Sequence, residues 1–298
     1  MRLWPYLALL IAGVAWGVGF PLAELSLPEI APAPLMLLRF LIASTACLPV
    51  AIRSREARRA FRDPWTWLAG AIYGPAFVLQ FEGLARTSVT LAALMVGVLP
   101  ALVAFVAPFV GERVSRLGWA GVAAATAGAV LIALRPGAAG TPVGVAMLVG
   151  SMLAYLGWFM VLRRVRPNPD PLAPPCAMIV TSTLFLALVV LPVFGPPTLH
   201  LSAKAWTGAA GTGLLCTAVA TVAWQLGAAR VPSTAAGVFV NIEPVVGSAL
   251  GVLAFHDPLT PALVAGGGLI VAGSVVVVLG ERRRDPGDLR PAAPQEAV

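Results

Sequence analysis

The chain has 298 residues, of which 59% are hydrophobic and 11% are charged, against about 25% charged residues in an ordinary soluble domain. This composition excludes a soluble globular protein and indicates a membrane protein. The net charge of +7 does not indicate a nucleic-acid partner, because the basic residues lie between apolar segments and do not cluster on one exposed face.

Ten apolar segments follow one another along the chain, each about long enough for a helix that crosses a hydrocarbon core of about 30 Å. They cover residues 4–24, 34–52, 65–85, 89–110, 117–135, 142–162, 172–194, 205–226, 234–254 and 260–280. The first follows Arg2 as a signal peptide would, but its apolar run is longer than the roughly 7–15 residues of such a peptide. We therefore expect an all-α polytopic membrane protein with ten transmembrane helices.

The distribution of arginines predicts the orientation. With the N-terminus in the cytoplasm, sixteen arginines fall in cytoplasmic segments, and the outer loops contain only Arg86, Arg135 and Lys204. Such an excess of positive charge is typical of cytoplasmic loops. The sequence thus predicts a multi-pass protein of the cell inner membrane with both termini in the cytoplasm. The polar, proline-rich residues 281–298 are predicted to form a disordered cytoplasmic tail.

An internal repeat organises the chain. Residues 83–100 align without a gap with residues 227–244, with seven identities in eighteen positions. Each half contains five predicted spans, an odd number, so the second copy is expected to lie upside down relative to the first. The predicted units are a five-helix repeat over residues 1–138 and an inverted five-helix repeat over residues 139–280.

The ninth span contains the polar residues Asn241 and Glu243, followed by Pro244. A charged group at mid-membrane costs on the order of 3 kcal/mol, which makes it a candidate functional site. Glu243 either couples a proton or binds a substrate ammonium, or it hydrogen-bonds the backbone that Pro244 frees and holds a kink. Pro100 is the equivalent of Pro244 in the repeat, so both are candidate hinges or kinks of a cavity wall.

Arg39 lies about five residues inside the second span. One interpretation is that it binds an anionic group such as a substrate carboxylate. The other, which we favour, is a self-neutralising cluster with Glu24 and Glu82, which lie at a similar depth. Glu82 could instead pair with Arg86, because the i, i+4 spacing brings the two side chains together on a helix.

Aromatic and polar side chains in other spans are candidates to line a pocket for an amphipathic solute, although such residues also pack in cores and face lipid. Together with Arg39, Asn241 and Glu243, this predicted substrate-binding set consists of Trp16, Tyr73, Gln80, Tyr155, Trp158, Trp224 and Gln225.

No catalytic or metal-binding motif competes with a transport site. The two histidines fall at outer loops, the three cysteines lie inside spans without a CxxC pair, and neither an HExxH motif nor a Walker loop occurs. We therefore predict neither a catalytic residue nor a metal site nor a cofactor.

Several short motifs together resemble those of the EamA family of the drug/metabolite transporter superfamily. They are Ala15-Trp16-Gly17, Leu38-Arg39-Phe40, Leu99-Pro100, Gly111-Glu112-Arg113-Val114 and Glu243-Pro244. The resemblance implies two inverted five-helix bundles around a central cavity, with the fifth and tenth spans at the periphery, often as a dimer surface. It also implies export or exchange of small metabolites, amino acids or drugs by alternating access. The chain departs from the family pattern at His256-Asp257, where a Gly-Glu pair is commoner.

These observations predict a secondary transporter that exports a small organic solute across the lipid bilayer, driven by a gradient, with the proton as coupling ion and Glu243 as its carrier. A homodimer through the glycine-bearing fifth and tenth spans is left open. Two alternatives also stay open: a channel or facilitator without ion coupling, and a polytopic lipid-modifying enzyme, although the acid/base and nucleophile clusters of such an enzyme are missing.

Overall fold

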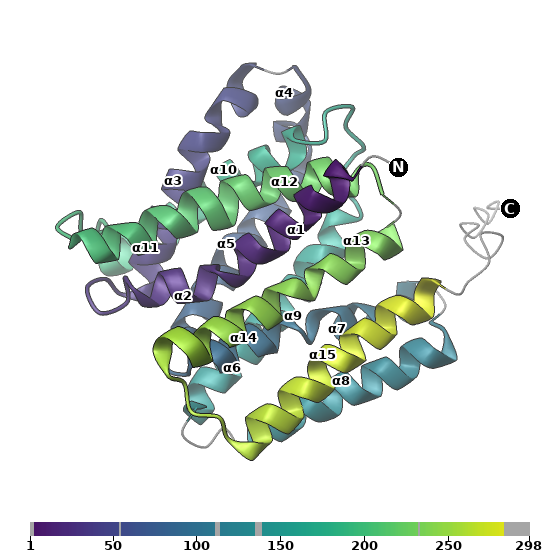
Figure 1. Cartoon of the computed structure of the whole chain (residues 1–298). Helices are drawn as coiled ribbons and strands as arrows, with labels where there is room; N and C mark the ends of the chain where they lie inside the picture. Colours follow the sequence, from purple (N-terminus) through teal and green to yellow (C-terminus); the bar gives the residue numbers. More distant parts are fainter. Residues whose placement is uncertain (1–2, 54, 111–113, 135–138, 232, 283–298) are drawn as a thin grey trace, which may run out of the picture.

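The computed structural model describes residues 3–53, 55–110, 114–134, 139–231 and 233–282. Within these ranges the protein is all-α, and its β-structure is limited to one isolated bridge between Thr87 and Gly140. The helices, shown in Figure 1, are α1 (Trp4–Gly17), α2 (Gly19–Glu24), α3 (Pro32–Arg53), α4 (Arg55–Phe61), α5 (Pro64–Leu84), α6 (Val89–Val96), α7 (Leu99–Val106), the 3-10 turn η1 (Ala107–Val110), α8 (Arg116–Leu134), α9 (Pro142–Leu162), α10 (Ala173–Phe194), α11 (Ala203–Gly213), the π-helical turn η3 (Leu214–Val219), α12 (Ala220–Ala228), α13 (Ser233–Val240), α14 (Ile242–Phe255) and α15 (Pro261–Arg282).

Every apolar segment predicted from the sequence lies on one or more of these helices. Among the described residues, eight helical segments are long and apolar enough to cross a membrane, and α5 and α8 lie outside that set. The short helix α4, over the arginine-rich stretch that separates α3 from α5, was not predicted. The predicted disordered tail lies almost entirely outside the described residues.

Helix breaks interrupt the two predicted spans that carry the mid-membrane prolines. In the first half, α6 ends at Val96 and α7 begins at Leu99, with Pro100 in its first turn. In the second half, α13 ends at Val240 and α14 begins at Ile242, so that Pro244 again lies in a first turn. Proline is tolerated there because the amide of a first-turn residue has no partner within the helix. The predicted kinks are therefore breaks between two half-helices.

The largest group of buried apolar side chains lies between α2, α3, α5, α6 and α9. Phe81 of α5, Leu91 of α6 and Leu148 of α9 are among its members, and each is at most 2% exposed. This core fixes α5 and α9 against the first half-helix of the broken α6–α7 pair, and therefore positions the side chains of α5 and α9 that point away from it.

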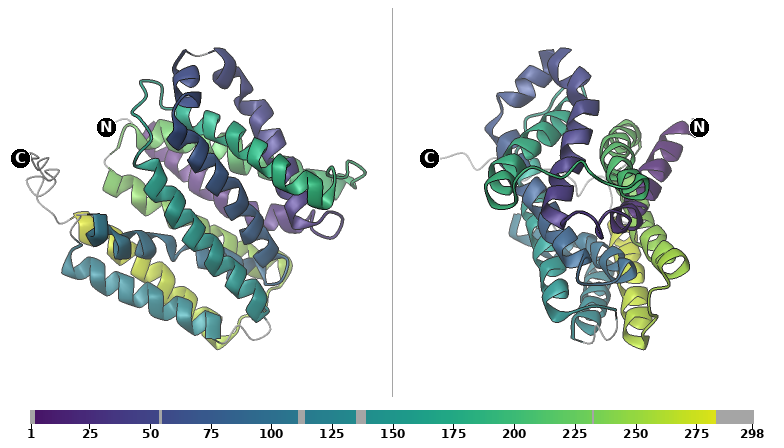
Figure 2. Two further views of the ribbon diagram at one scale, coloured as in Figure 1. Left: turned by 180° about the vertical axis from the view of Figure 1, so that it is seen from behind. Right: turned by 90° about the vertical axis from the view of Figure 1, so that its left-hand side faces the viewer.

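Helices α8 and α15 run side by side at one edge of the bundle (Figures 1 and 2). Their glycines meet across the interface: a Cβ on Gly121 would contact the carbonyl oxygen of Gly273, and a Cβ on Gly128 would contact that of Gly266. Small residues permit this close backbone approach. The glycines that left a dimer open in the sequence thus join the fifth and tenth predicted spans within one chain.

Glycines also permit close approach between α5 and α9 and between α12 and α1. A Cβ placed on Gly83 of α5 would lie 2.8 Å from Leu148 Cγ of α9, and one placed on Gly227 of α12 would lie 2.7 Å from Leu9 Cγ of α1. Gly83 and Gly227 are equivalent in the sequence repeat. Each half therefore supplies the glycine for one contact and the leucine for the other, an exchange typical of a two-fold relation.

Candidate functional site

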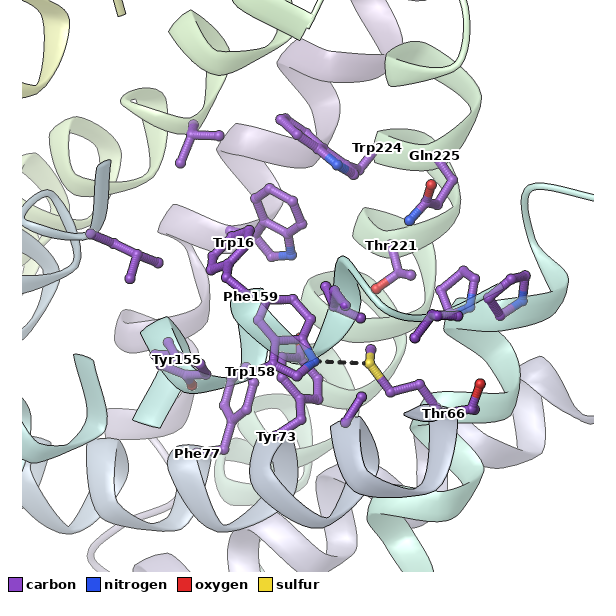
Figure 3. Close-up of a pocket in the computed structure, with 18 of the residues that line it drawn as sticks. Trp16, Thr66, Tyr73, Phe77, Tyr155, Trp158, Phe159, Thr221, Trp224 and Gln225 are labelled. Atoms are coloured by element: carbon purple, nitrogen blue, oxygen red, sulfur yellow. Dashed lines mark hydrogen bonds between the residues drawn. The ribbon is translucent and has the colours of Figure 1, made fainter. Parts of the chain in front are cut away.

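A cavity of about 510 Å³ lies in the middle of the bundle, between α5, α9 and α10 on one side and α1 and α12 on the other. The helix breaks also reach it, through Val96 and Leu99 in the first half and through Val240 and Glu243 in the second. Nine of the predicted binding residues line it: Trp16, Arg39, Tyr73, Gln80, Tyr155, Trp158, Trp224, Gln225 and Glu243. Figure 3 labels six of these, namely Trp16, Tyr73, Tyr155, Trp158, Trp224 and Gln225. Their role in substrate binding stays a prediction.

One wall of the cavity is made of stacked aromatic rings from α5 and α9. The rings of Tyr73 and Trp158 stack with centroids 4.6 Å apart, and Phe77 meets Tyr155 edge-on at 5.4 Å. The Trp158 indole also donates a hydrogen bond to the sulfur of Met178, at 3.1 Å (Figure 3). Residues 73 and 77 are one helical turn apart, so α5 presents them on one face.

The opposite wall combines two tryptophan rings with polar side chains. Trp16 of α1 and Trp224 of α12 lie with ring centroids 5.2 Å apart, and Figure 3 places them across the cavity from Tyr73 and Phe77. Thr221 and Gln225 of α12 line the same wall. Aromatic surface with a few polar groups is typical of pockets for small organic ligands.

Arg39 lies at the buried end of the cavity and is 3% exposed. Its Nε donates to Thr217 Oγ1 at 2.8 Å, and its guanidinium lies 4.4 Å from the centroid of the Phe77 ring. The favoured cluster of Arg39 with Glu24 and Glu82 is wrong, because within the described residues Arg39 has no carboxylate within 4.0 Å. Glu82 instead pairs with Arg86 at 2.6 Å, one turn along α5, as the i, i+4 spacing allowed.

Glu243 lies in the first turn of α14, is partly buried and lines the cavity. Its carboxylate has no hydrogen bond within the part of the chain that the structure describes. The interpretation that this side chain holds the backbone freed by Pro244 therefore lacks the bond that it requires.

Asn241 does not line the cavity, unlike the other predicted binding residues. It is 6% exposed and occupies the position between α13 and α14. Its side-chain oxygen accepts a hydrogen bond from the hydroxyl of Ser274 in α15. The helix break turns Asn241 toward the peripheral helix, whereas Glu243, two residues on, faces the cavity.

The cavity reaches the surface at the end formed by the loop between α9 and α10. Its lining includes the exposed residues Arg166 and Pro167, in the loop between α9 and α10, which lies at the same end of the bundle as the start of α1 (Figure 1). Asp63, the N-cap residue of α5, holds this loop by accepting a hydrogen bond from Arg166 N at 2.7 Å.

The other end of the cavity is closed by packed side chains. Phe20 and Phe81 are each no more than 3% exposed, and their rings stack at 5.7 Å. Beyond them, Thr90 N at the start of α6 donates to Asp257 Oδ2 at 2.6 Å. Asp257 thus joins the two halves at the closed end.

Sequence reasoning missed several lining residues, among them Phe77, Phe81, Phe159, Thr221 and the loop before α10. The spacing of Tyr73, Phe77 and Phe81 by single helical turns was a signal that could have identified the α5 wall. The loop carried no such signal, because its position depends on the contact of Arg166 with Asp63.

This arrangement defines a multi-pass membrane protein with a solute-sized cavity between helices of both halves. The model of the EamA-like transporter family matches residues 3–134 and again residues 142–279. The chain therefore belongs to the EamA-like transporter family, and each match falls within one predicted half.

Two similar proteins carry transporter names. A probable terminal-alkyne amino-acid exporter of Streptantibioticus cattleyicolor is 28% identical over 93% of this chain and 95% of its own length. An uncharacterized transporter of Archaeoglobus fulgidus is 24% identical over 93% of this chain and 99% of its own. One solved crystal structure is 22% identical, with a TM-score of 0.64 over 96% of this chain and the whole of that chain, and it supports the fold.

Proposed function

We propose that the protein is a secondary transporter that exports small organic solutes across the cell inner membrane by alternating access. The observation that carries this proposal is a cavity lined by both halves, which reaches the surface beside Arg166 and is closed at Phe20 and Phe81. Carriers bind their substrates near the membrane midplane and open to one side at a time. If the N-terminus is cytoplasmic, as the loop charges predict, this conformation is open to the cytoplasm, where an exporter loads.

Ten membrane crossings in two inverted five-helix repeats are part of the proposal. The exchanged contacts of Gly83 with Leu148 and of Gly227 with Leu9 support it, as do the two successive family matches. Two equivalent halves that run in opposite directions can exchange their conformations. The exchange would close the end beside Arg166 and open the end at Asp257, which is how inverted repeats produce alternating access.

Amino acids are the first substrate class to test. The relative named as a probable amino-acid exporter aligns with almost the whole chain, and the aromatic walls around Tyr73, Trp158 and Trp224 suit an apolar side chain. The volume of about 510 Å³ lies within the range of pockets for small ligands, roughly 300–1,000 Å³.

Glu243 is the proposed coupling residue. Its carboxylate faces the cavity without a hydrogen-bond partner among the described residues, so that a proton or a substrate ammonium can bind it in turn. Ionisable groups placed in this way are typical of proton pathways in transporters. Entry of a proton from outside would then displace the solute's ammonium and drive net export.

The test is counterflow in proteoliposomes preloaded with unlabelled amino acids. Labelled L-phenylalanine should accumulate transiently and saturably, and an imposed proton gradient should stimulate net flux. Glu243→Gln should lose the stimulation by the proton gradient, and its counterflow should persist with a raised KM, because the variant also loses the partner of the solute's ammonium. The matched control is Glu82→Gln, which removes an acid that pairs with Arg86 away from the cavity, and it should behave as the wild type.

Two results would count against these assignments. Flux that rises linearly with concentration and shows no counterflow would indicate a channel. Unchanged uptake and unchanged pH dependence in Glu243→Gln would remove the proton role while leaving the carrier intact.

A further inference from the structure

The Arg39 guanidinium is a buried cation whose local partners leave most of its donors unused. Among the described residues its hydrogen bonding is limited to Nε with Thr217 Oγ1. Phe77 and Phe81 lie over the guanidinium at 4.4 Å and 5.3 Å from their ring centroids. Aromatic faces attract a cation but accept no in-plane hydrogen bond from it. The terminal Nη atoms are therefore available at the edge of the cavity.

An irregular turn places the hydroxyl that holds Arg39. The chain from α11 to α12 passes through the π-helical turn η3, Leu214–Val219. Within it, Thr217 Oγ1 donates to Thr212 O at 2.9 Å, five residues back. This bond uses the only proton of the hydroxyl, so that its lone pairs are left for Arg39 Nε. π-Helical turns are rare and occur often at functional sites.

The close approach of α11 to α3 explains why the turn meets Arg39. A Cβ on Gly213, the last residue of α11, would lie 2.8 Å from Ile42 Cβ and 2.9 Å from Arg39 O. The glycine thus brings η3 against the backbone of Arg39, and Thr217, four residues on, reaches the side chain.

The first half has no π-helical turn at the equivalent position in α5. Gly70 of α5 meets Thr181 of α10 as Gly213 meets Ile42, so the two glycines are equivalent. The spacing from Gly70 to Gly213 is one residue shorter than the spacing from Gly83 to Gly227. The second copy therefore contains one extra residue between these points, where η3 lies, while α5 is continuous from Pro64 to Leu84.

We propose that Arg39, positioned by Thr217 and the π-turn, is the subsite for the carboxylate of the transported solute. The inference rests on the proposed function and specifies its substrate class as carboxylate-bearing solutes. A guanidinium fixed at Nε presents its Nη donors as a fork that matches a carboxylate. Glu243, which lines the same cavity with the opposite charge, repels that carboxylate and suits an ammonium group on the same molecule.

The test uses purified full-length protein and four ligands of one shape: L-phenylalanine, phenylacetate, L-phenylalaninamide and phenethylamine. Binding is followed by tryptophan fluorescence, because Trp16, Trp158 and Trp224 line the cavity. L-Phenylalanine should bind at least about tenfold tighter than its amide, which corresponds to one charge-assisted hydrogen-bonded contact. Phenylacetate should bind tighter than phenethylamine.

Three variants separate positioning from folding. Thr217→Val should lower the affinity for both carboxylate ligands about tenfold and leave the affinity for the amide and the amine unchanged. Thr217→Ser keeps a hydroxyl and should restore carboxylate binding. Thr183→Val is the matched control, because Thr183 is buried and hydrogen-bonded to Phe40 O but does not line the cavity. It should leave the ratio of carboxylate to amide affinity unchanged.

The subsite would be overturned if neither carboxylate bound, if the amide bound as tightly as L-phenylalanine, or if Thr217→Val weakened all four ligands equally. These outcomes differ from failure of the transporter proposal, which would appear as absent counterflow with every solute tested. Saturable counterflow without preference for a carboxylate would overturn the subsite alone.

Discussion

The two halves of the protein differ most where they meet the cavity. Ser44 and Thr183 hydrogen-bond each other at 2.6 Å and are 139 residues apart in the sequence. The same separation relates Leu9 to Leu148 and Arg39 to Met178, so these residues occupy equivalent positions in the two halves. The first half therefore places a guanidinium where the second places a thioether that accepts a bond from Trp158. At the helix breaks it is the second half that carries the charged residue, since Glu243 of the second half corresponds to Leu99 of the first.

This difference separates what the fold needs from what the site needs. Helix packing is conserved between the halves, because glycines at equivalent positions make equivalent contacts. The charges are not shared, because an apolar residue occupies each equivalent position. The fold can therefore be built without Arg39 or Glu243, and their burial, which has a free-energy cost, has to be explained by something other than architecture.

Replacing Arg39 by the residue of the equivalent position tests this comparison most strongly. Arg39→Met should lower the rate of counterflow at least about 30-fold, because loss of one partner from a buried charge pair costs about 2 kcal/mol or more and each 1.4 kcal/mol is a factor of about ten. The melting temperature should stay unchanged or rise, since a buried charge is replaced by an apolar side chain of similar length. Met178→Leu is the control and should change the rate by less than about threefold. Near-normal counterflow in Arg39→Met would contradict the division between fold and site.

Equivalent glycines should respond equally to substitution. A Cβ on Gly213 would lie 2.8 Å from Ile42 Cβ, and one on Gly70 would lie 2.9 Å from Ser182 N. Gly213→Ala and Gly70→Ala should each destabilise the protein by about 1–3 kcal/mol through overpacking, measured as a lower melting temperature in detergent. Gly157→Ala is the control, because a Cβ there would meet no atom within 4 Å. A large difference between Gly70→Ala and Gly213→Ala would show that the halves are not packed equivalently.

A smaller effect should follow from the hydroxyl of Tyr155, which donates to Gln80 Oε1 at 2.8 Å. Trp16 and Trp224 are the equivalent residues of the other wall and meet through their rings. Tyr155→Phe keeps the ring but leaves the buried Gln80 amide without that donor, at a cost of about 1 kcal/mol. The KM for the transported solute should rise up to about fivefold with little change in the maximal rate. A normal KM would mean that this bond does not shape the cavity wall.

The smallest effect on stability is expected from a loop contact of Glu29. At the closed end, Ser202, the N-cap of α11, donates from its amide and its hydroxyl to the carboxylate of Glu29, at 2.7 Å and 2.5 Å. These hydrogen bonds lower the pKa of Glu29 below its ordinary value of 4.5. The contact therefore stabilises the folded protein above the ordinary pKa, and its contribution is lost as the pH falls through the lowered pKa.

Acidification from pH 6 to pH 3 should thus lower the melting temperature of the wild type slightly more than that of Glu29→Gln, which cannot titrate. Identical pH profiles for the wild type and Glu29→Gln would remove the Glu29 contact as a source of stability.

Nine of the ten binding residues predicted from the sequence line the cavity, because polar and aromatic residues in apolar spans have few other places to lie. Trp16, Gln80 and Glu243 belong to this group. The prediction of a cavity position failed for Asn241, where a helix break directs the side chain to Ser274. The prediction of an ion pair failed for Arg39, whose expected partner Glu82 is paired with Arg86. The extra residue in η3 gave no signal, because the stretch around it is rich in alanine, glycine and threonine.

By itself, the sequence determined a helical membrane protein of two related halves, because apolar length, loop charge and internal repetition are properties of the chain read locally. Only the tertiary structure decided which side of each helix faces the cavity and which residues pair across it. Each residue turns an α-helix by about 100°, so that one break or one inserted residue redirects a side chain. The position of Thr217 against Arg39 therefore depends on how α11 packs on α3.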